Sequence, residues 1–185
     1  MIARMLFATG YEEVEALTVV DLLRRAGIDC RMVSVYDEDY AVGSHNITIK
    51  MDEKISEIGD DADAVILPGG MPGVTNLIAS DKVKKIVTGQ YNSGKLVAAV
   101  CAAPTALGSF GILKDKKATC YPGMEGQLNS REFLTDPVVT DGNVVTSRGM
   151  GTSIEFGLKI VELLKDKDTA CLLYTSDAAD ERSSV

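Results

Sequence analysis

Short, almost continuously apolar runs alternate with longer amphipathic stretches, and this alternation strongly limits the folds open to the chain. The apolar runs are IARMLFAT (2–9), CRMVSVY (30–36), DAVILPGG (63–70), KLVAAV (95–100) and NVVTS (143–147). Their length and composition are typical of strands that are buried on both faces. Because such strands occur in parallel sheets covered by helices, the pattern predicts an α/β fold: a flavodoxin-like three-layer sandwich with a mostly parallel central sheet.

The stretches between these runs predict helices at residues 12–28, 80–94 and 153–166. Gly27 and Gly94 are placed to end the first two, since glycine readily adopts the conformation that closes a helix. Residues 37–58, which include HNITIK, are expected to form a β-hairpin insertion.

A length of 185 residues fits one domain, which we place at residues 1–170. Residues 171–185 form an atypical tail, because TSDAADERSSV is polar and has no apolar face. Two interpretations of the tail stay open: a disordered C-terminus, or a sequence left from cloning or sequencing.

Composition excludes several classes of function. A formal net charge of −8 without a lysine or arginine cluster argues against a nucleic-acid surface. The chain has no apolar run near the ~18 residues of a membrane span, and its N-terminus lacks the features of a signal peptide, so we expect a cytoplasmic protein. The cysteines are widely spaced, which argues against a zinc cluster or a disulfide framework. They are Cys30, Cys101, Cys120 and Cys171.

The predicted carboxyl ends of four strands carry residues of chemical interest, and sites in open α/β sheets form beyond such ends. In chain order these residues are Glu12, Glu13 and Glu15; Gly69 and Gly70; Cys101; and Arg148 and Gly149. We therefore expect these four segments to converge at one edge of the sheet.

Cys101 lies directly after the KLVAAV run and is followed by Ala102 and Ala103. Small neighbours suit a Cys nucleophile elbow, a strained turn from strand to helix. The dipole of the following helix would favour the thiolate, and amides of Ala102 and of the Gly69–Gly70 loop would hold an oxyanion. A buried core cysteine is the alternative, and the spacing alone does not decide between them.

Glu15 has a similar ambiguity. Acidic residues favour a helix N-terminus without any catalytic role. A buried carboxyl beside a thiol, however, would have a raised pKa, donate a hydrogen bond to the sulfur and shuttle protons. His45 is the only histidine and lies in the insertion, where it is either a surface residue or part of a substrate pocket or dimer interface.

Four stretches together resemble the ThiJ/PfpI superfamily, and within it the parkinsonism-associated deglycase (DJ-one-like) subgroup. They are YEEVEALTVVDLLRRAGI, ILPGGMPG, AAVCAAPTALGSFGIL and VVTSRGMGTSIEFGLKIVELL. The resemblance covers about residues 2 to 168. It implies that Cys101 is an oxidation-sensitive nucleophile, that Glu15 hydrogen-bonds it, that Gly70 and Ala102 supply oxyanion donors and that Arg148 lies near the site.

The resemblance also implies a homodimer that needs no metal or organic cofactor. Members are described as glutathione-independent glyoxalases, as protein deglycases that act on glycated species, and as redox-responsive chaperones. His45 matches a position that is often basic, near the partner subunit's site.

Three departures from related proteins narrow the function. Ala102 stands where the protease branch has histidine, which argues against a peptidase. No histidine follows residue 45, which argues against a glutamine amidotransferase. Tyr121 stands where many relatives have a histidine, so we expect it to bind substrate rather than transfer protons.

We therefore expect an enzyme that converts small 2-oxoaldehydes, methylglyoxal or glyoxal, to 2-hydroxy acids through a Cys101 hemithioacetal with Glu15 as acid and base. The alternative is a redox-sensing stress protein or chaperone with an oxidisable Cys101 and little turnover. Both hypotheses use the same residues. A hydrolase of small amides or esters has weaker support, because it lacks a general base of the usual type.

Overall fold

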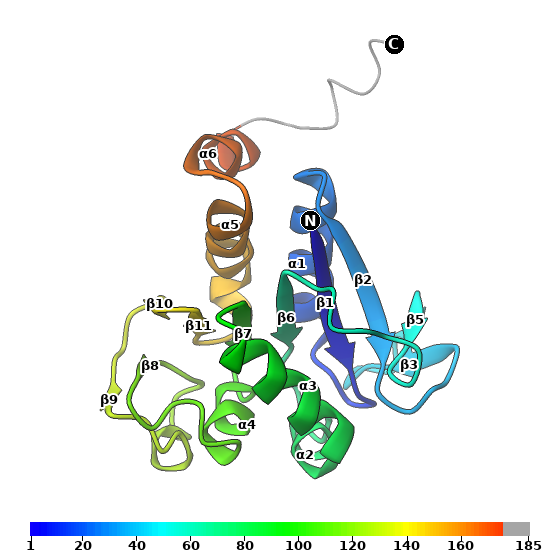
Figure 1. The fold of residues 1–185 in the computed structure, drawn as a ribbon, viewed down its shortest axis with the longest axis horizontal. Helices are drawn as coiled ribbons and strands as arrows, with labels where there is room; N and C mark the ends of the chain where they lie inside the picture. The colour runs from blue at the N-terminus through cyan, green and yellow to red at the C-terminus, as the bar shows by residue number, and fades with distance from the viewer. Residues whose placement is uncertain (176–185) are drawn as a thin grey trace.

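The computed structural model describes residues 1–175 and contains a seven-stranded sheet with helices on both faces (Figure 1). In spatial order the strands are β10 (Val138–Asp141), β11 (Val144–Ser147), β7 (Leu96–Val100), β6 (Ala64–Leu67), β1 (Ile2–Phe7), β2 (Asp29–Ser34) and β5 (Glu53–Lys54). Only the pairing of β10 with β11 is antiparallel. The mostly parallel sheet and the predicted fold class are confirmed.

Helices α1 (Glu13–Arg25), α5 (Ser153–Leu164) and α6 (Lys167–Thr175) cover one face of this sheet. Helices α2 (Gly73–Ala79), α3 (Asp81–Asn92) and α4 (Pro104–Ser109) cover the other. Consecutive side chains of β1 enter opposite cores: Met5 and Phe7 pack under α1, and Leu6 packs on the other face. Burial on both faces explains why the strands are continuously apolar instead of alternating.

Hydrogen bonds define an end of each of the first two predicted helices. The Ser80 hydroxyl accepts the Val83 amide at 3.3 Å, which caps α3. Gly27 follows α1 with a φ of +70°, and the amides of Gly27 and Ile28 bond back to the last turn of the helix. This arrangement is a Schellman motif, which a glycine at that position stabilises.

The predicted insertion contains the expected hairpin, because β3 (Tyr40–Val42) pairs antiparallel with β4 (Thr48–Lys50). The hairpin docks against the chain that leads into α1: the Gly10 amide donates to Val42 and the Ser44 amide donates to Tyr11, each at 2.8 Å. A further small sheet pairs β8 (Lys117–Ala118) with β9 (Glu132–Phe133), and two 3₁₀ turns lie at Glu125–Gln127 and Met150–Thr152.

The C-terminal end of the domain differs from the sequence-based boundary at residue 170. Helix α6 continues to Thr175 and buries Ala170 against the same core as α1 and α5. The rest of the predicted tail, residues 176–185, lies outside the described residues. Within residues 1–175, every helix is too short or too polar to cross a membrane.

Candidate functional site

Cys101 occupies a left-handed backbone conformation directly after β7, with a φ of +62°. A non-glycine residue there stores about 1–3 kcal/mol of strain, so the surroundings must hold it in place. Two backbone hydrogen bonds do so: the Cys101 amide donates to Ser147 at 2.9 Å, and its carbonyl accepts the Tyr121 amide at 2.8 Å. The strained turn directs the half-buried side chain of Cys101 toward the loop after β6 and the start of α1.

Gly69 allows Glu15 and Cys101 to meet. A Cβ atom on Gly69 would lie 2.3 Å from Oε2 of Glu15, 2.6 Å from Cβ of Cys101 and 3.2 Å from its Sγ. Such distances are far below van der Waals contact, so a side chain at this position would separate the carboxyl from the thiol. Three strand ends that are distant in sequence thus converge as expected.

Glu15 is a buried carboxyl in the first turn of α1, with 1% of its surface exposed. Its Oε2 accepts the Gly69 amide at 3.0 Å. Burial raises the pKa of Glu15 to about 7, and the nearby Glu12 carboxylate adds to this, although hydrogen bonds from Cys101 and Gly69 oppose it. Glu15 can therefore both accept and donate a proton near neutral pH.

The expectation of a stabilised Cys101 thiolate is not met. Burial raises the pKa of the thiol to about 12, and the adjacent Glu15 charge raises it further, while the amides of Ala102 and Gly70 oppose the rise. The helix dipole gives little help, because α4 begins at Pro104 and is only six residues long.

Glu15 and Cys101 therefore titrate as a coupled pair, since each negative charge disfavours the other. Because the pKa of Glu15 is about 7, its carboxyl is ionised in about half of the molecules near neutral pH, while the thiol stays protonated, and the carboxylate form accepts a hydrogen bond from the thiol. Moving that single proton from sulfur to oxygen produces a thiolate beside a neutral carboxyl. The arrangement thus activates the thiol by proton transfer within the pair, without a permanently ionised cysteine.

The expected oxyanion donors divide into two roles. The amides of Gly70 and Ala102 face the Cys101 sulfur, so their part in holding an oxyanion stays a prediction. Gly69 was grouped with them, but its amide donates to Glu15 and its carbonyl accepts the Glu12 amide at 2.9 Å. Gly69 therefore positions the acid instead of binding an oxyanion.

Gly149 forms part of the site, although its neighbour Arg148 was the predicted pocket residue. A Cβ on Gly149 would lie 3.9 Å from Sγ of Cys101, 3.9 Å from Oε1 of Glu15 and 3.6 Å from the Tyr121 ring. This glycine follows β11, and the pairing of β11 with β7 brings it beside Cys101. Tyr121 is 51% exposed, so its ring stands at the rim, where it can contact a substrate.

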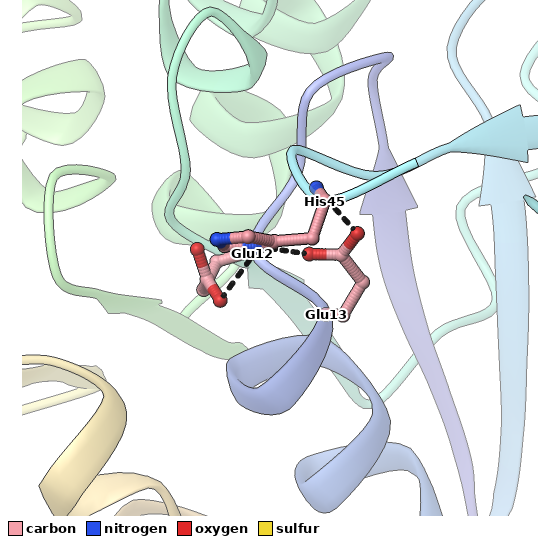
Figure 2. Close-up of side chains that lie close together, drawn as sticks. All are labelled: Glu12, Glu13 and His45. Atoms are coloured by element: carbon pink, nitrogen blue, oxygen red, sulfur yellow. Dashed lines mark hydrogen bonds and ion pairs between the residues drawn. The ribbon is translucent and has the colours of Figure 1, made fainter. Parts of the chain in front are cut away.

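The other two predicted pocket residues make their contacts elsewhere. The Arg148 guanidinium donates to the Thr135 carbonyl at 2.9 Å. His45 is exposed at the hairpin tip, where its Nδ1 lies 2.9 Å from Oε2 of Glu13 and 3.6 Å from Oε1 of Glu12 (Figure 2). His45 is thus linked to the first turn of α1, and through Glu12 to the surroundings of Glu15.

The chain matches the DJ-1/PfpI family over residues 2–163. It belongs to that family. It is 39% identical over 169 residues to Protein dj-1beta of Drosophila melanogaster, which covers 90% of each chain. It is also 32% identical to the glutathione-independent glyoxalase DJR-1.2 of Caenorhabditis elegans, with 83% of each chain covered.

Solved DJ-1 structures have the same fold. Drosophila melanogaster DJ-1beta superposes with a TM-score of 0.90 at 38% identity, covering 93% of this chain and 94% of that one. Oxidized Toxoplasma gondii DJ-1 superposes with a TM-score of 0.90 at 32% identity, covering 100% and 99%. The flavodoxin-like sandwich is therefore a property shared with solved DJ-1 proteins.

Proposed function

We propose that this DJ-1/PfpI protein is a cofactor-independent glyoxalase that acts on methylglyoxal, glyoxal or similar 2-oxoaldehydes. The observation that carries the proposal is the contact of the Cys101 thiol with the buried Glu15 carboxyl, with the amides of Gly70 and Ala102 facing the sulfur. The similarity to a glutathione-independent glyoxalase of Caenorhabditis elegans supports the choice of substrate class.

The reaction begins when the Cys101 proton moves to the Glu15 carboxylate as the sulfur attacks the aldehyde carbon, C1. The carbonyl oxygen becomes an alkoxide, which the amides of Gly70 and Ala102 stabilise by hydrogen bonds. The alkoxide then takes up the proton held by Glu15, which gives a neutral hemithioacetal and restores the carboxylate.

Glu15 next removes the proton from C1 and delivers it to C2, through an enediol, while the proton of the C1 hydroxyl passes to the C2 oxygen. This converts the hemithioacetal of the 2-oxoaldehyde into a thioester of the 2-hydroxy acid, without any net change in oxidation state. Water hydrolyses the thioester, releasing the 2-hydroxy acid and the Cys101 thiol. A base with a pKa of about 7 suits both transfers, because it gains and loses protons readily at neutral pH.

The test is lactate formation from methylglyoxal by the purified protein. We expect Cys101→Ala to abolish lactate formation and Glu15→Gln to reduce it by roughly 100-fold or more, the scale of a general acid–base contribution. Exposed Cys171 provides a matched control, and Cys171→Ala should retain the wild-type rate. Full turnover by Cys101→Ala would contradict the proposal.

A second function uses the same residues: a redox-sensing stress protein in which Cys101 is oxidised to the sulfinate. The observation in its favour is that a protonated Glu15 and the amides of Gly70 and Ala102 surround the sulfur and would donate hydrogen bonds to sulfinate oxygens. Mass spectrometry after mild peroxide, beside the lactate assay, separates the two. Stable addition of two oxygens to Cys101 without lactate formation would favour the sensor.

A further inference from the structure

We propose that Glu12, Glu13 and His45 form a binding site for a divalent transition-metal ion of the zinc type (Figure 2). Within residues 1–175, this is the one group of three or more His, Cys, Asp or Glu side chains whose ligand atoms all lie within 4.8 Å of one another. The site uses neither Cys101 nor Glu15, so none of its ligands takes part in the steps of the proposed glyoxalase reaction.

The two separations from the His45 imidazole are close to those between neighbouring ligands of a single ion. The Nδ1 atom of His45 lies 2.9 Å from Oε2 of Glu13 and 3.6 Å from Oε1 of Glu12. Zinc binds imidazole nitrogen and carboxylate oxygen at about 2.0–2.2 Å, so neighbouring ligands lie about 3–3.5 Å apart at angles of 90–110°. One imidazole and two carboxylates form a ligand set that zinc accepts.

Two separate segments of the chain build this group. The helix dipole explains the two acidic residues but not the approach of the hairpin tip. Glu12 and Glu13 lie at the start of α1, where acidic side chains are favoured in any case. His45 and Ser44 come from the hairpin tip, and the Ser44 hydroxyl lies 3.1 Å from Glu12, 3.1 Å from Glu13 and 3.0 Å from Nδ1 of His45. Four polar side chains thus converge on one small volume.

The group is also short of positive charge. Two carboxylates carry a charge of −2, and a protonated His45 returns only +1. Ser44 has one hydroxyl proton, yet an oxygen of Glu12 and an oxygen of Glu13 both lie within its reach. A divalent cation in place of the imidazole proton would neutralise both carboxylates and satisfy both oxygens.

The fold holds one ligand in place in advance and leaves another open to solvent. The Glu13 side chain is only 6% exposed, and its Oε1 is fixed by the His45 amide at 2.7 Å, which leaves Oε2 facing the imidazole. Gly43 packs so closely that a Cβ there would lie 2.2 Å from Oε1. The His45 side chain is 69% exposed, so an ion can enter from solution.

The experiment uses the full chain without a polyhistidine tag, titrated with Zn²⁺ and observed through the imidazole signals in a ¹H–¹⁵N NMR spectrum. Because the sequence has one histidine, these signals report on His45 alone, whatever the metal does at the thiols. We expect Nδ1 of His45 to shift and to saturate at one equivalent of Zn²⁺. Isothermal titration calorimetry provides the affinity.

Glu12→Gln is the informative variant, because Glu13 still holds the hairpin tip in place. We expect it to weaken zinc binding at least about tenfold, since losing even an outer-shell partner costs 10–100-fold. The exposed Glu57→Gln should bind like the wild type. An unchanged His45 spectrum under excess Zn²⁺, or equal affinity in Glu12→Gln, would overturn the proposal.

Discussion

Replacing Gly69 by alanine tests the geometry of the site more directly than removing a reactive group. Gly69 is not among the glycines with positive φ, so its backbone accepts alanine without strain. The added methyl would lie 2.3 Å from Oε2 of Glu15 and 2.6 Å from Cβ of Cys101, whereas ordinary contacts begin at about 3.4 Å. Relief of this overlap requires the two side chains to separate by about 1 Å.

A displacement of that size has two expected consequences. Misplacing a reacting group by 1 Å costs about 100-fold in rate, so we expect methylglyoxal turnover in Gly69→Ala to fall to about 1% of wild type. Overpacking a filled interior costs about 1–3 kcal/mol of unfolding free energy. Lactate production and urea denaturation measure the two effects.

Gly89 provides the matched control, because it lies inside α3 and a Cβ there would meet nothing within 4 Å. Gly89→Ala should keep full activity and stabilise the fold by up to about 1 kcal/mol, through the better helix propensity of alanine. Activity of Gly69→Ala within twofold of wild type would refute the argument, since Glu15 and Cys101 would then tolerate separation.

The remaining predictions concern a buried charge and an exposed surface. The pKa of Glu15 is about 7 in the folded chain, above the 4.5 of an unperturbed carboxyl. Between these two pH values the native state binds more protons than the unfolded chain, so wild-type stability falls as the pH rises. Relative to Glu15→Gln, the wild type should lose up to about 3 kcal/mol between pH 4.5 and pH 8 in urea denaturation, and a constant difference would contradict the burial of an ionisable Glu15. We also propose that the chain is a homodimer that covers the exposed apolar side chains of Val14, Met150 and Ile154, of which 46%, 59% and 54% are accessible. Ile154→Asp should then sediment as a monomer, whereas a wild-type monomer would contradict the proposal.

Most of the layered fold could be predicted from local patterns. Five strands and three helices lie within a few residues of their predicted positions, because burial on both faces makes a strand continuously apolar and a glycine marks the end of a helix. Helices α2 and α6 escaped prediction since each is short and carries little amphipathic pattern. The antiparallel strand β10 is also short, and only part of it is buried.

The main residues of the candidate site could be predicted, but the contacts between them could not. Cys101 stood out through its small neighbours at the end of a strand, and Glu15 through its place after another strand. The role of the Gly69 amide could not be foreseen, because its partner Glu15 lies 54 residues away in the sequence. The importance of Gly149 likewise depends on the pairing of β11 with β7.

The sequence by itself determined the alternation of strands and helices and the residue types at each strand end, because periodic burial and turn chemistry are local properties. Only the tertiary structure decided which of those residues meet and which ionise. The raised pKa values of Glu15 and Cys101 result from the removal of water by segments distant in sequence. The same holds for Glu13 and His45, which meet because the hairpin folds back onto the start of α1.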